Sequence, residues 1–286
     1  MNTLSKYGKN IKSQDGEDGI LEYIFSVIGE GSKRCVEFGA WDGEYLSNTW
    51  NLVVNRGWEG VYIESDKKKY KSLFEKWRGG NKKVLTINKR IESTGNSTLD
   101  NILKSHDIPK QIDLLSIDVD GNEYYIWESI REYKARVIVI EHNPTIPPHI
   151  EAIGCKGNTN IGSSVLALCN LAKRKGHELI CCTATNSIFV LGELFDLFNI
   201  EDNTPERLMQ KEHFTYVLST YDGRLILTRK PTYSRIAESP SLRKLKGFVF
   251  GLVKAMAIKN KKLVAYSADD LYEIIPFYCK RVKGKL

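Results

Sequence analysis

Glycines and carboxylates are interspersed within residues 34–66 in a pattern that suits the binding of a nucleoside. The stretch RCVEFGAWDG holds Gly39 and Gly43, where the backbone can approach a ligand closely. Glu64 ends the next apolar stretch, VYIE, and its carboxylate can accept hydrogen bonds from two ribose hydroxyls. This order is typical of a nucleoside-binding βαβ unit, in which a strand is followed by a glycine-bearing loop, a helical stretch and a second strand that ends in an acid.

The same loop differs from the turn that binds dinucleotides. A Gly-x-Gly-x-x-Gly turn makes room for a pyrophosphate, whereas this loop has only two glycines. It carries carboxylates at Glu37 and Asp42, and these would repel a phosphate. The residues therefore predict a ligand that combines a ribose with a positive charge.

Six short motifs in this order resemble the FkbM-type branch of class I S-adenosylmethionine-dependent methyltransferases. They are SQDGEDGILEYIF (13–25), VEFGAWDGEYLSNT (36–49), VYIESD (61–66), STLDNIL (97–103), LLSIDVDGNEYYIW (114–127) and VIVIEHNP (137–144). The resemblance covers residues 13 to about 192. It implies S-adenosylmethionine as the cofactor, a cation that carries a ribose, and acceptors that are sugars or other hydroxyl compounds.

Predicted strands and helices alternate through the first half of the chain. The expected strands are 34–38, 60–64, 83–88, 112–118 and 136–141, and the expected helices follow residue 13 and lie near 48–57, 66–77, 97–106 and 122–133. Such alternation predicts an α/β fold with a Rossmann-like, mostly parallel sheet and right-handed crossovers. A helix within 162–176 and two strands within 177–191 follow, and the resemblance implies that these strands form a terminal antiparallel hairpin.

The chain is expected to contain a methyltransferase domain, 1–192, and a basic C-terminal appendage, 193–286. Residues 229–286 hold 14 Lys or Arg and only 4 Asp or Glu, so they account for the net charge of +7. Such a charge suits an anionic partner, for example a phosphorylated or nucleotide-linked glycan, or it forms a solvated lysine-rich surface. An amphipathic helix expected at 241–258 would cover the substrate, mediate oligomerisation, touch a membrane surface peripherally or simply pack.

Cysteine and apolar patterns predict a cytoplasmic protein. The six cysteines form no C-x-x-C pair and do not pair with histidines at zinc-finger spacing, which favours free thiols in a reducing compartment. The N-terminal residues MNTLSKYGKN have no apolar signal core, and no apolar run is long enough to span a membrane.

Acidic residues end four of the predicted strands, at Glu37, Glu64, Asp118 and Glu141. Ligands of parallel sheets bind beyond the carboxyl ends of the strands, so these charges should face one crevice, where a bound cation would offset their repulsion. The predicted cofactor-binding residues are Gln14, Glu17, Glu37, Gly39, Ala40, Asp42, Gly43, Ser47, Asn48, Thr49, Glu64 and Asp118. Gln14 and Glu17 are included because of the resemblance, and the alternative for their segment is a helix start.

The chemical step has two sequence-based explanations. In the first, His142 is the general base that takes the proton of the acceptor hydroxyl, with Asp118 and Asp120 beside the methyl donor. In the second, Asp118, Glu141 and His142 bind Mg²⁺ or Mn²⁺, which lowers the pKa of that hydroxyl.

The leading hypothesis is an S-adenosylmethionine-dependent O-methyltransferase that acts on a sugar, a nucleotide sugar or a surface-polysaccharide precursor. The main alternative is a non-catalytic nucleoside-binding protein whose basic tail binds a glycan or membrane partner. Methylation of nucleic acid is not expected, because no Asn/Asp-Pro-Pro-aromatic motif follows the fourth strand.

Overall fold

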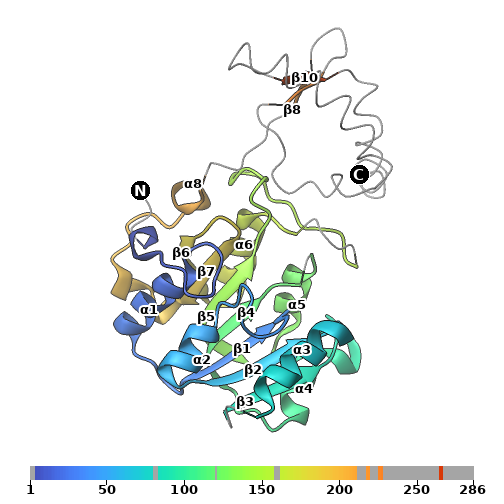
Figure 1. The fold of residues 1–286 in the computed structure, drawn as a ribbon. Coiled ribbons are helices and arrows are strands. Elements are labelled where there is room, and N and C mark those ends of the chain that lie inside the picture. Colours follow the sequence, from blue (N-terminus) through green and yellow to red (C-terminus); the bar gives the residue numbers. More distant parts are fainter. Residues whose placement is uncertain are drawn as a thin grey trace. The chain divides into compact units, whose positions relative to one another are not determined.

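The computed structural model describes residues 4–79, 83–119, 121–157 and 162–210, and the backbone of three later strands. The chain divides into two compact units, Met1–Gln210 and Lys211–Leu286. The first unit contains the sheet, the helices around it and the residues that the sequence assigns to chemistry (Figure 1).

A seven-stranded sheet in the order β3-β2-β1-β4-β5-β7-β6 forms the centre of the first unit. Its strands are β1 Arg34–Phe38, β2 Glu59–Glu64, β3 Val84–Asn88, β4 Gln111–Ile117, β5 Lys134–Glu141, β6 His177–Cys182 and β7 Asn186–Leu191. Strands β1 to β5 are parallel, whereas β7 is antiparallel to both β5 and β6. This arrangement confirms the predicted mostly parallel sheet with a terminal antiparallel hairpin.

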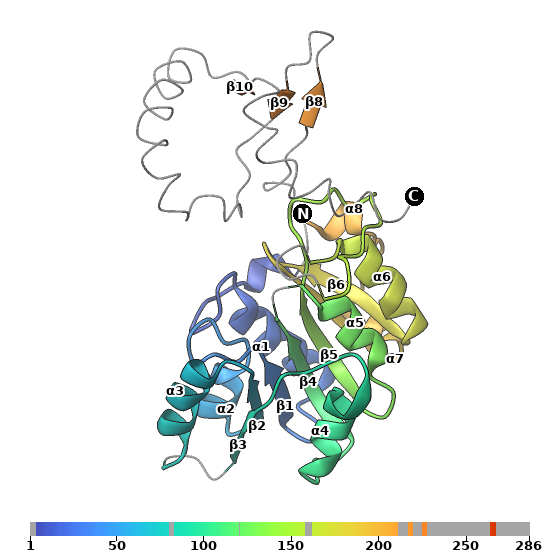
Figure 2. The same cartoon turned by 90° about the vertical axis from the view of Figure 1, so that its right-hand side faces the viewer.

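Helices cover both faces of this sheet (Figure 2). They are α1 Glu17–Ile28, α2 Trp50–Arg56, α3 Lys67–Trp77, α4 Leu99–Ser105, α5 Glu123–Ser129 and α6 Val165–Arg174. Helices α1, α2 and α3 lie on one face, and α4, α5 and α6 on the other. Because both faces are covered, the central strands are almost continuously apolar and buried, as in β4 and β5.

Local sequence explains where several helices begin. The Asp66 side chain accepts hydrogen bonds from the amides of Lys68 and Lys69 at the start of α3. The Ser164 side chain accepts one from Ala167 at the start of α6. Capping of this kind satisfies amides that have no partner in the first helical turn.

Residues 192–210 belong to the first compact unit. They form α7 Gly192–Phe195, a 3₁₀ turn at Asp196–Phe198 and α8 Pro205–Leu208. Phe198 and Leu208 are buried, and α8 packs against β6 and α6. The boundary predicted at residue 192 therefore falls inside the compact unit, which reaches Gln210.

Three short strands are described in the second unit: β8 Val217–Ser219, β9 Leu225–Leu227 and β10 Val264–Tyr266. They pair antiparallel in the order β10-β9-β8, and the turn expected at Asp222 and Gly223 between β8 and β9 lies outside the described residues. The helix expected at 241–258 lies outside the described residues. Among the helices that the structure describes, none is both long and apolar enough to cross a bilayer.

The strand order reverses at β1, which pairs with β2 on one side and with β4 on the other. In open parallel sheets, ligands bind beyond the carboxyl ends of the strands at such a reversal. A ligand is therefore expected at the loops that follow β1, β2, β4 and β5.

Candidate active site

The loop after β1 lies directly against the end of β4. Gly39 has a φ of +76°, and a Cβ added there would lie 1.6 Å from the carbonyl oxygen of Asp118. The amides of Gly39 and Ala40 both donate to the carbonyl of Ile63 in β2, at 3.1 and 3.3 Å. Only glycine fits this position, because any side chain would push β1 and β4 apart at the reversal point.

Glu64 lies at the end of β2, as the sequence predicts, and is 4% exposed. Its Oε2 accepts the amide of Trp41 at 2.9 Å, and its Oε1 accepts the amide of Asp66 at 2.7 Å. Each carboxylate oxygen has capacity for a second hydrogen bond. The side chain is thus held in one orientation and retains capacity to bind ribose hydroxyls.

Glu37 on β1 organises the segment that leads into α2. Its Oε2 accepts the hydroxyls of Ser47 and Thr49 at 2.6 Å each, and its Oε1 accepts the amide of Asn48 at 2.9 Å. Burial raises the pKa of the Glu37 carboxyl above its ordinary value, and these hydrogen bonds oppose that shift. The structure therefore brings together four predicted cofactor residues, with Glu37 holding the other three in place.

Asp42 and Gly43 face helix α3. The Asp42 carboxylate accepts the amides of Glu44 and Tyr45 and forms an ion pair with Lys76 at 2.8 Å. Partial burial raises the pKa of Asp42, but these hydrogen bonds outweigh it and hold the pKa below its usual range. A Cβ on Gly43 would lie 2.5 Å from the indole nitrogen of Trp77, so this glycine is required for packing on α3.

The SQDGED segment is attached to the turn between β6 and β7. Glu17 is completely buried and accepts hydrogen bonds from the Thr183 hydroxyl at 2.6 Å and the Asn186 amide group at 2.9 Å. Asn186 pairs with Glu141 across β7 and β5, so this turn lies at the carboxyl edge of the sheet. Gln14 is exposed in the same segment.

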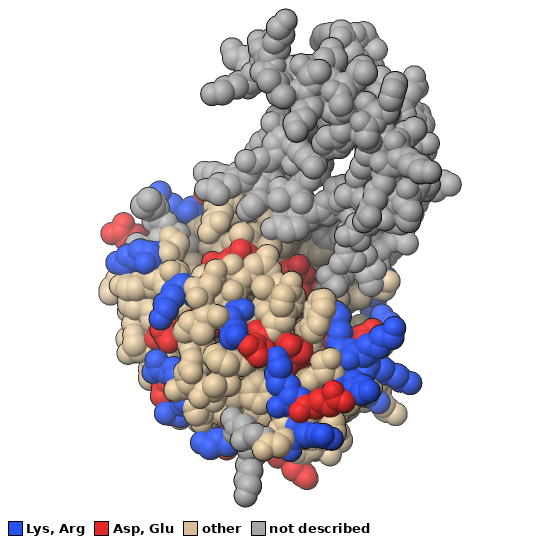
Figure 3. Space-filling view, viewed as in Figure 1, with Lys and Arg blue, Asp and Glu red and all other residues tan. Residues whose placement is uncertain are grey.

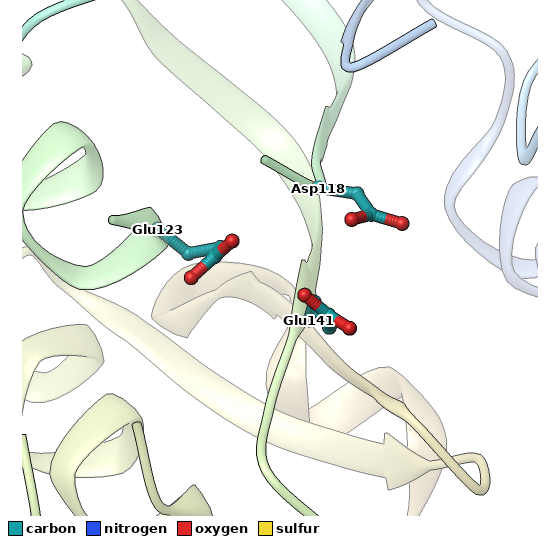
Figure 4. Close-up of side chains that lie close together, drawn as sticks. All are labelled: Asp118, Glu123 and Glu141. Carbon is teal, nitrogen blue, oxygen red and sulfur yellow. The ribbon is translucent and has the colours of Figure 1, made fainter. Parts of the chain in front are cut away.

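Three carboxylates from separate elements meet at the ends of β4 and β5 (Figure 4). They are Asp118, which is exposed, Glu141, which is half-buried, and Glu123, which is buried at the start of α5. One oxygen of each lies within 4.8 Å of the others. We call Asp118, Glu123 and Glu141 the edge acid group.

Sequence reasoning missed Glu123. One of its oxygens, Oε1, accepts the amides of Val119 and Gly121 at 3.1 and 2.6 Å, which folds the chain after β4 back toward Asp118. The signal available in the sequence was its position five residues after Asp118, at the start of a predicted helix. Asp120, a predicted catalytic residue, lies outside the described residues.

His142 does not join the edge acid group. It is 1% exposed, its Nδ1 lies 3.0 Å from the Ser187 hydroxyl on β7, and its backbone amide donates to Thr185. The expected metal-binding set of Asp118, Glu141 and His142 is thus replaced by a set in which Glu123 takes the place of the histidine. Burial between strands also separates the imidazole from solvent, where an acceptor hydroxyl would approach.

Comparison with known families gives one match within the first unit. Residues 74–173 match the Methyltransferase FkbM domain, and this range includes all three members of the edge acid group. Comparison with curated proteins finds no match.

Solved structures with some likeness to this chain include three methyltransferases. The CMeT domain of the citrinin polyketide synthase is 11% identical, with a TM-score of 0.39, over 55% of this chain and 46% of that domain's chain. A putative RNA methyltransferase from Pyrococcus horikoshii is 13% identical, with a TM-score of 0.39, and the match covers 60% of this chain and 80% of that chain. The glycopeptide N-methyltransferase MtfA, complexed with S-adenosyl-L-homocysteine, is 12% identical, with a TM-score of 0.39, and the match covers 66% of this chain and 95% of that chain.

TM-scores below 0.5 do not by themselves establish a common fold, and the chain spans less than half of the first of these proteins. The family match and the sheet order are the stronger observations, because each is a direct property of this chain. Together they agree with the resemblance found in the six sequence motifs. Residues 74–173 thus match an FkbM methyltransferase domain, which is the family that the sequence motifs resemble.

Proposed function

We propose that this protein transfers a methyl group from S-adenosylmethionine to a hydroxyl of a sugar, a nucleotide sugar or a surface-polysaccharide precursor. The observation that carries the proposal is the position of Glu64 and Asp118 on the two sides of the strand reversal, within the edge that Gly39 closes. A ribose on Glu64 leaves the far end of the cofactor directed toward β4 and Asp118.

The bound cofactor would supply an electrophilic methyl group. The residues of the chain then have two tasks, which are to align the acceptor oxygen with that methyl group and to take the hydroxyl proton. Asp118 is exposed and Glu141 is half-buried, so both can meet an acceptor from solvent. A hydroxyl acceptor suits this edge, because carboxylates orient it by accepting its hydrogen bond and can then accept its proton.

A divalent cation held by the edge acid group is a second candidate for activating the hydroxyl. All three ligands would be carboxylate oxygens, which is the donor type that Mg²⁺ and Mn²⁺ prefer. Such an ion would lower the pKa of the acceptor hydroxyl.

The two candidates are separated by activity in the presence of a chelator. Full activity in chelator favours the carboxylates alone, whereas loss of activity that Mg²⁺ or Mn²⁺ restores favours the cation. The activity assay also tests the proposed methyl transfer to a sugar. In it, the protein is incubated with labelled S-adenosylmethionine and a panel of nucleotide sugars, and the product should be heavier by one methyl group. Absence of labelled product with every sugar would contradict the sugar substrate.

The nature of the partner and the cellular compartment stay predictions. Figure 3 shows acidic and basic side chains interspersed on one face of the described surface. The excess of Lys and Arg at 229–286 is the feature that supports an anionic glycan as partner. Truncation of these residues with normal turnover would remove them from substrate binding.

A further inference from the structure

Two buried carboxylates next to the loop after β1 form no ion pair with any basic side chain that the structure describes. Asp18, in the first turn of α1, is 1% exposed, and Glu37 is 5% exposed. In the described part of the chain, only uncharged donors contribute hydrogen bonds to them, from backbone amides and hydroxyl groups. We call Asp18 and Glu37 the buried acid pair. Buried charges in proteins are normally paired with an opposite charge, so this pair requires an explanation.

The two oxygens of Asp18 differ in their surroundings. Oδ2 accepts the amides of Ile11, Lys12 and Ser13 at 2.7, 2.7 and 2.8 Å. Oδ1 is buried and accepts no hydrogen bond from any described residue. A buried carboxylate oxygen without a donor is unfavourable, and such an atom in a native protein indicates a missing water, ion or ligand.

Asp100 is a second buried aspartate with one such oxygen, but its electrostatic surroundings differ from those of Asp18. Its Oδ2 accepts the amides of Arg131 and Glu132, and its Oδ1 likewise accepts no hydrogen bond from the described residues. Asp100, however, lies near enough to Lys110 and Lys175 for its charge to act on theirs. The charge of Asp18 acts instead on another carboxylate, Glu37.

The buried acid pair lies where a ligand of the sheet would bind. Helix α1 begins at the carboxyl edge, because Glu17 is bonded to the turn between β6 and β7. Residues 11–13, which wrap around the Asp18 carboxylate, also line a hollow of about 350 Å³ together with residues of the loop after β1. Asp18 is therefore adjacent to the loop to which the sequence assigns the cofactor.

We propose that Asp18 Oδ1 accepts a hydrogen bond from the ammonium group of the methionine part of S-adenosylmethionine, while Glu37 adds its negative charge to the same subsite. The proposal rests on the function proposed above. An ammonium group has three donors and one positive charge, so it satisfies the unpaired oxygen and offsets the repulsion within the pair. Glu37 is one of the predicted cofactor-binding residues, but its oxygens already accept hydrogen bonds from Ser47, Asn48 and Thr49.

Binding at this subsite requires residues 11–13 to shift, because they wrap closely around Asp18. An ion pair between Lys12 and Glu44 ties this segment to the loop after β1. Both side chains are about one-third exposed, at 34% and 32%. Exposed ion pairs contribute little free energy, so this tie can open for a ligand.

Calorimetry on the full chain with two ligands tests the proposal. S-adenosylhomocysteine carries the ammonium group, whereas 5′-methylthioadenosine keeps the adenosine and the sulfur but lacks it. Asp18→Asn should weaken the binding of S-adenosylhomocysteine by roughly 10- to 100-fold, because a charge-assisted hydrogen bond is lost. The affinity for 5′-methylthioadenosine should stay unchanged. Asp100→Asn is the matched control and should change neither affinity.

An equal loss for both ligands would make Asp18 a purely structural residue and overturn the proposal, as would an unchanged affinity for S-adenosylhomocysteine. Failure of the wild-type chain to bind either ligand would instead refute the proposed function. If Asp18→Asn does not fold, a crystal structure of the wild-type chain with S-adenosylhomocysteine decides the question. An amino nitrogen in hydrogen-bonding contact with Asp18 Oδ1 supports the subsite, and a water on that oxygen with the ammonium group elsewhere contradicts it.

Discussion

The buried acid pair and the edge acid group lie at the same edge of one sheet, yet they differ in exposure and in attachment. Asp18 and Glu37 are almost inaccessible, and among the described residues backbone amides and hydroxyls donate six hydrogen bonds to them. In the edge acid group, Asp118 is exposed and Glu141 is half-buried. The first region suits a ligand that is always the same, and the second suits an acceptor that must enter, lose a proton and leave.

Because of this contrast, substitutions in the two regions should differ in their effect on folding stability. Removing a buried, hydrogen-bonded carboxylate leaves donors without partners and lowers stability. Removing an exposed carboxylate changes the chemistry with little effect on folding.

Gly39→Ala should have the largest effect, because Gly39 joins the two regions. The new Cβ would collide with the carbonyl of Asp118, and the residue would keep a positive φ, so the free energy of unfolding should fall by about 3 kcal/mol or more. Gly29→Ala is the control, since Gly29 has a φ of +75° but open space around it. Chemical denaturation of both variants measures the difference, and equal losses would show that the contact with β4 is unimportant.

Asp118→Asn should abolish most of the chemistry while the fold persists. Turnover should fall by about 100-fold or more, as for loss of a general base, and the affinity for S-adenosylhomocysteine should change much less. Glu151→Gln, an exposed acid in the loop after β5, is the control. Normal turnover in Asp118→Asn would remove Asp118 from catalysis.

Glu37 should produce a pH dependence of stability that Asp118 does not. Burial raises its pKa in the folded state above the ordinary value of 4.5, so the folded chain binds a proton more readily than the unfolded chain. Its contribution is therefore greatest below pH 4.5 and is lost as the pH rises through the folded-state pKa.

The matched measurement is the difference in unfolding free energy between the wild-type chain and Glu37→Gln from pH 4 to pH 8. The wild-type chain should lose stability relative to the variant as the pH rises. Parallel curves would mean that Glu37 is not destabilised by burial.

Lys76→Met should have the smallest effect. Lys76 pairs with Asp42 at 2.8 Å and with Glu44 at 2.7 Å, but its side chain is 36% exposed. Surface ion pairs of this kind contribute about 0–1 kcal/mol, and salt should reduce the contribution further. A larger loss that persists at high salt would show that this network is essential for the loop after β1.

The sequence predicted the sheet well because its signals are local. Apolar runs such as LLSI and VIVI, separated by capped helices, have few alternatives to buried parallel strands. The predicted positions of Gly39, Glu64 and Asp118 at the strand ends follow from the same pattern.

The misses concern side-chain direction. His142 follows a strand-ending acid, yet its ring packs against Ser187 from a strand 45 residues away. Glu123 enters the edge acid group because the chain turns after β4, and Asp18 acts on the charge of Glu37 because α1 begins at the same edge. Such contacts depend on how distant elements pack, which strand and helix periodicity does not encode.

The most direct test of the account is calorimetry of the wild-type chain and Glu64→Gln with S-adenosylhomocysteine. The wild-type chain should bind this ligand and not NAD, and Glu64→Gln should weaken binding by about 1–2 kcal/mol because a charge-assisted bond to the ribose is lost. Glu75→Gln, an exposed acid on α3, should bind normally. Binding of NAD in place of S-adenosylhomocysteine, or an unchanged affinity in Glu64→Gln, would contradict the account.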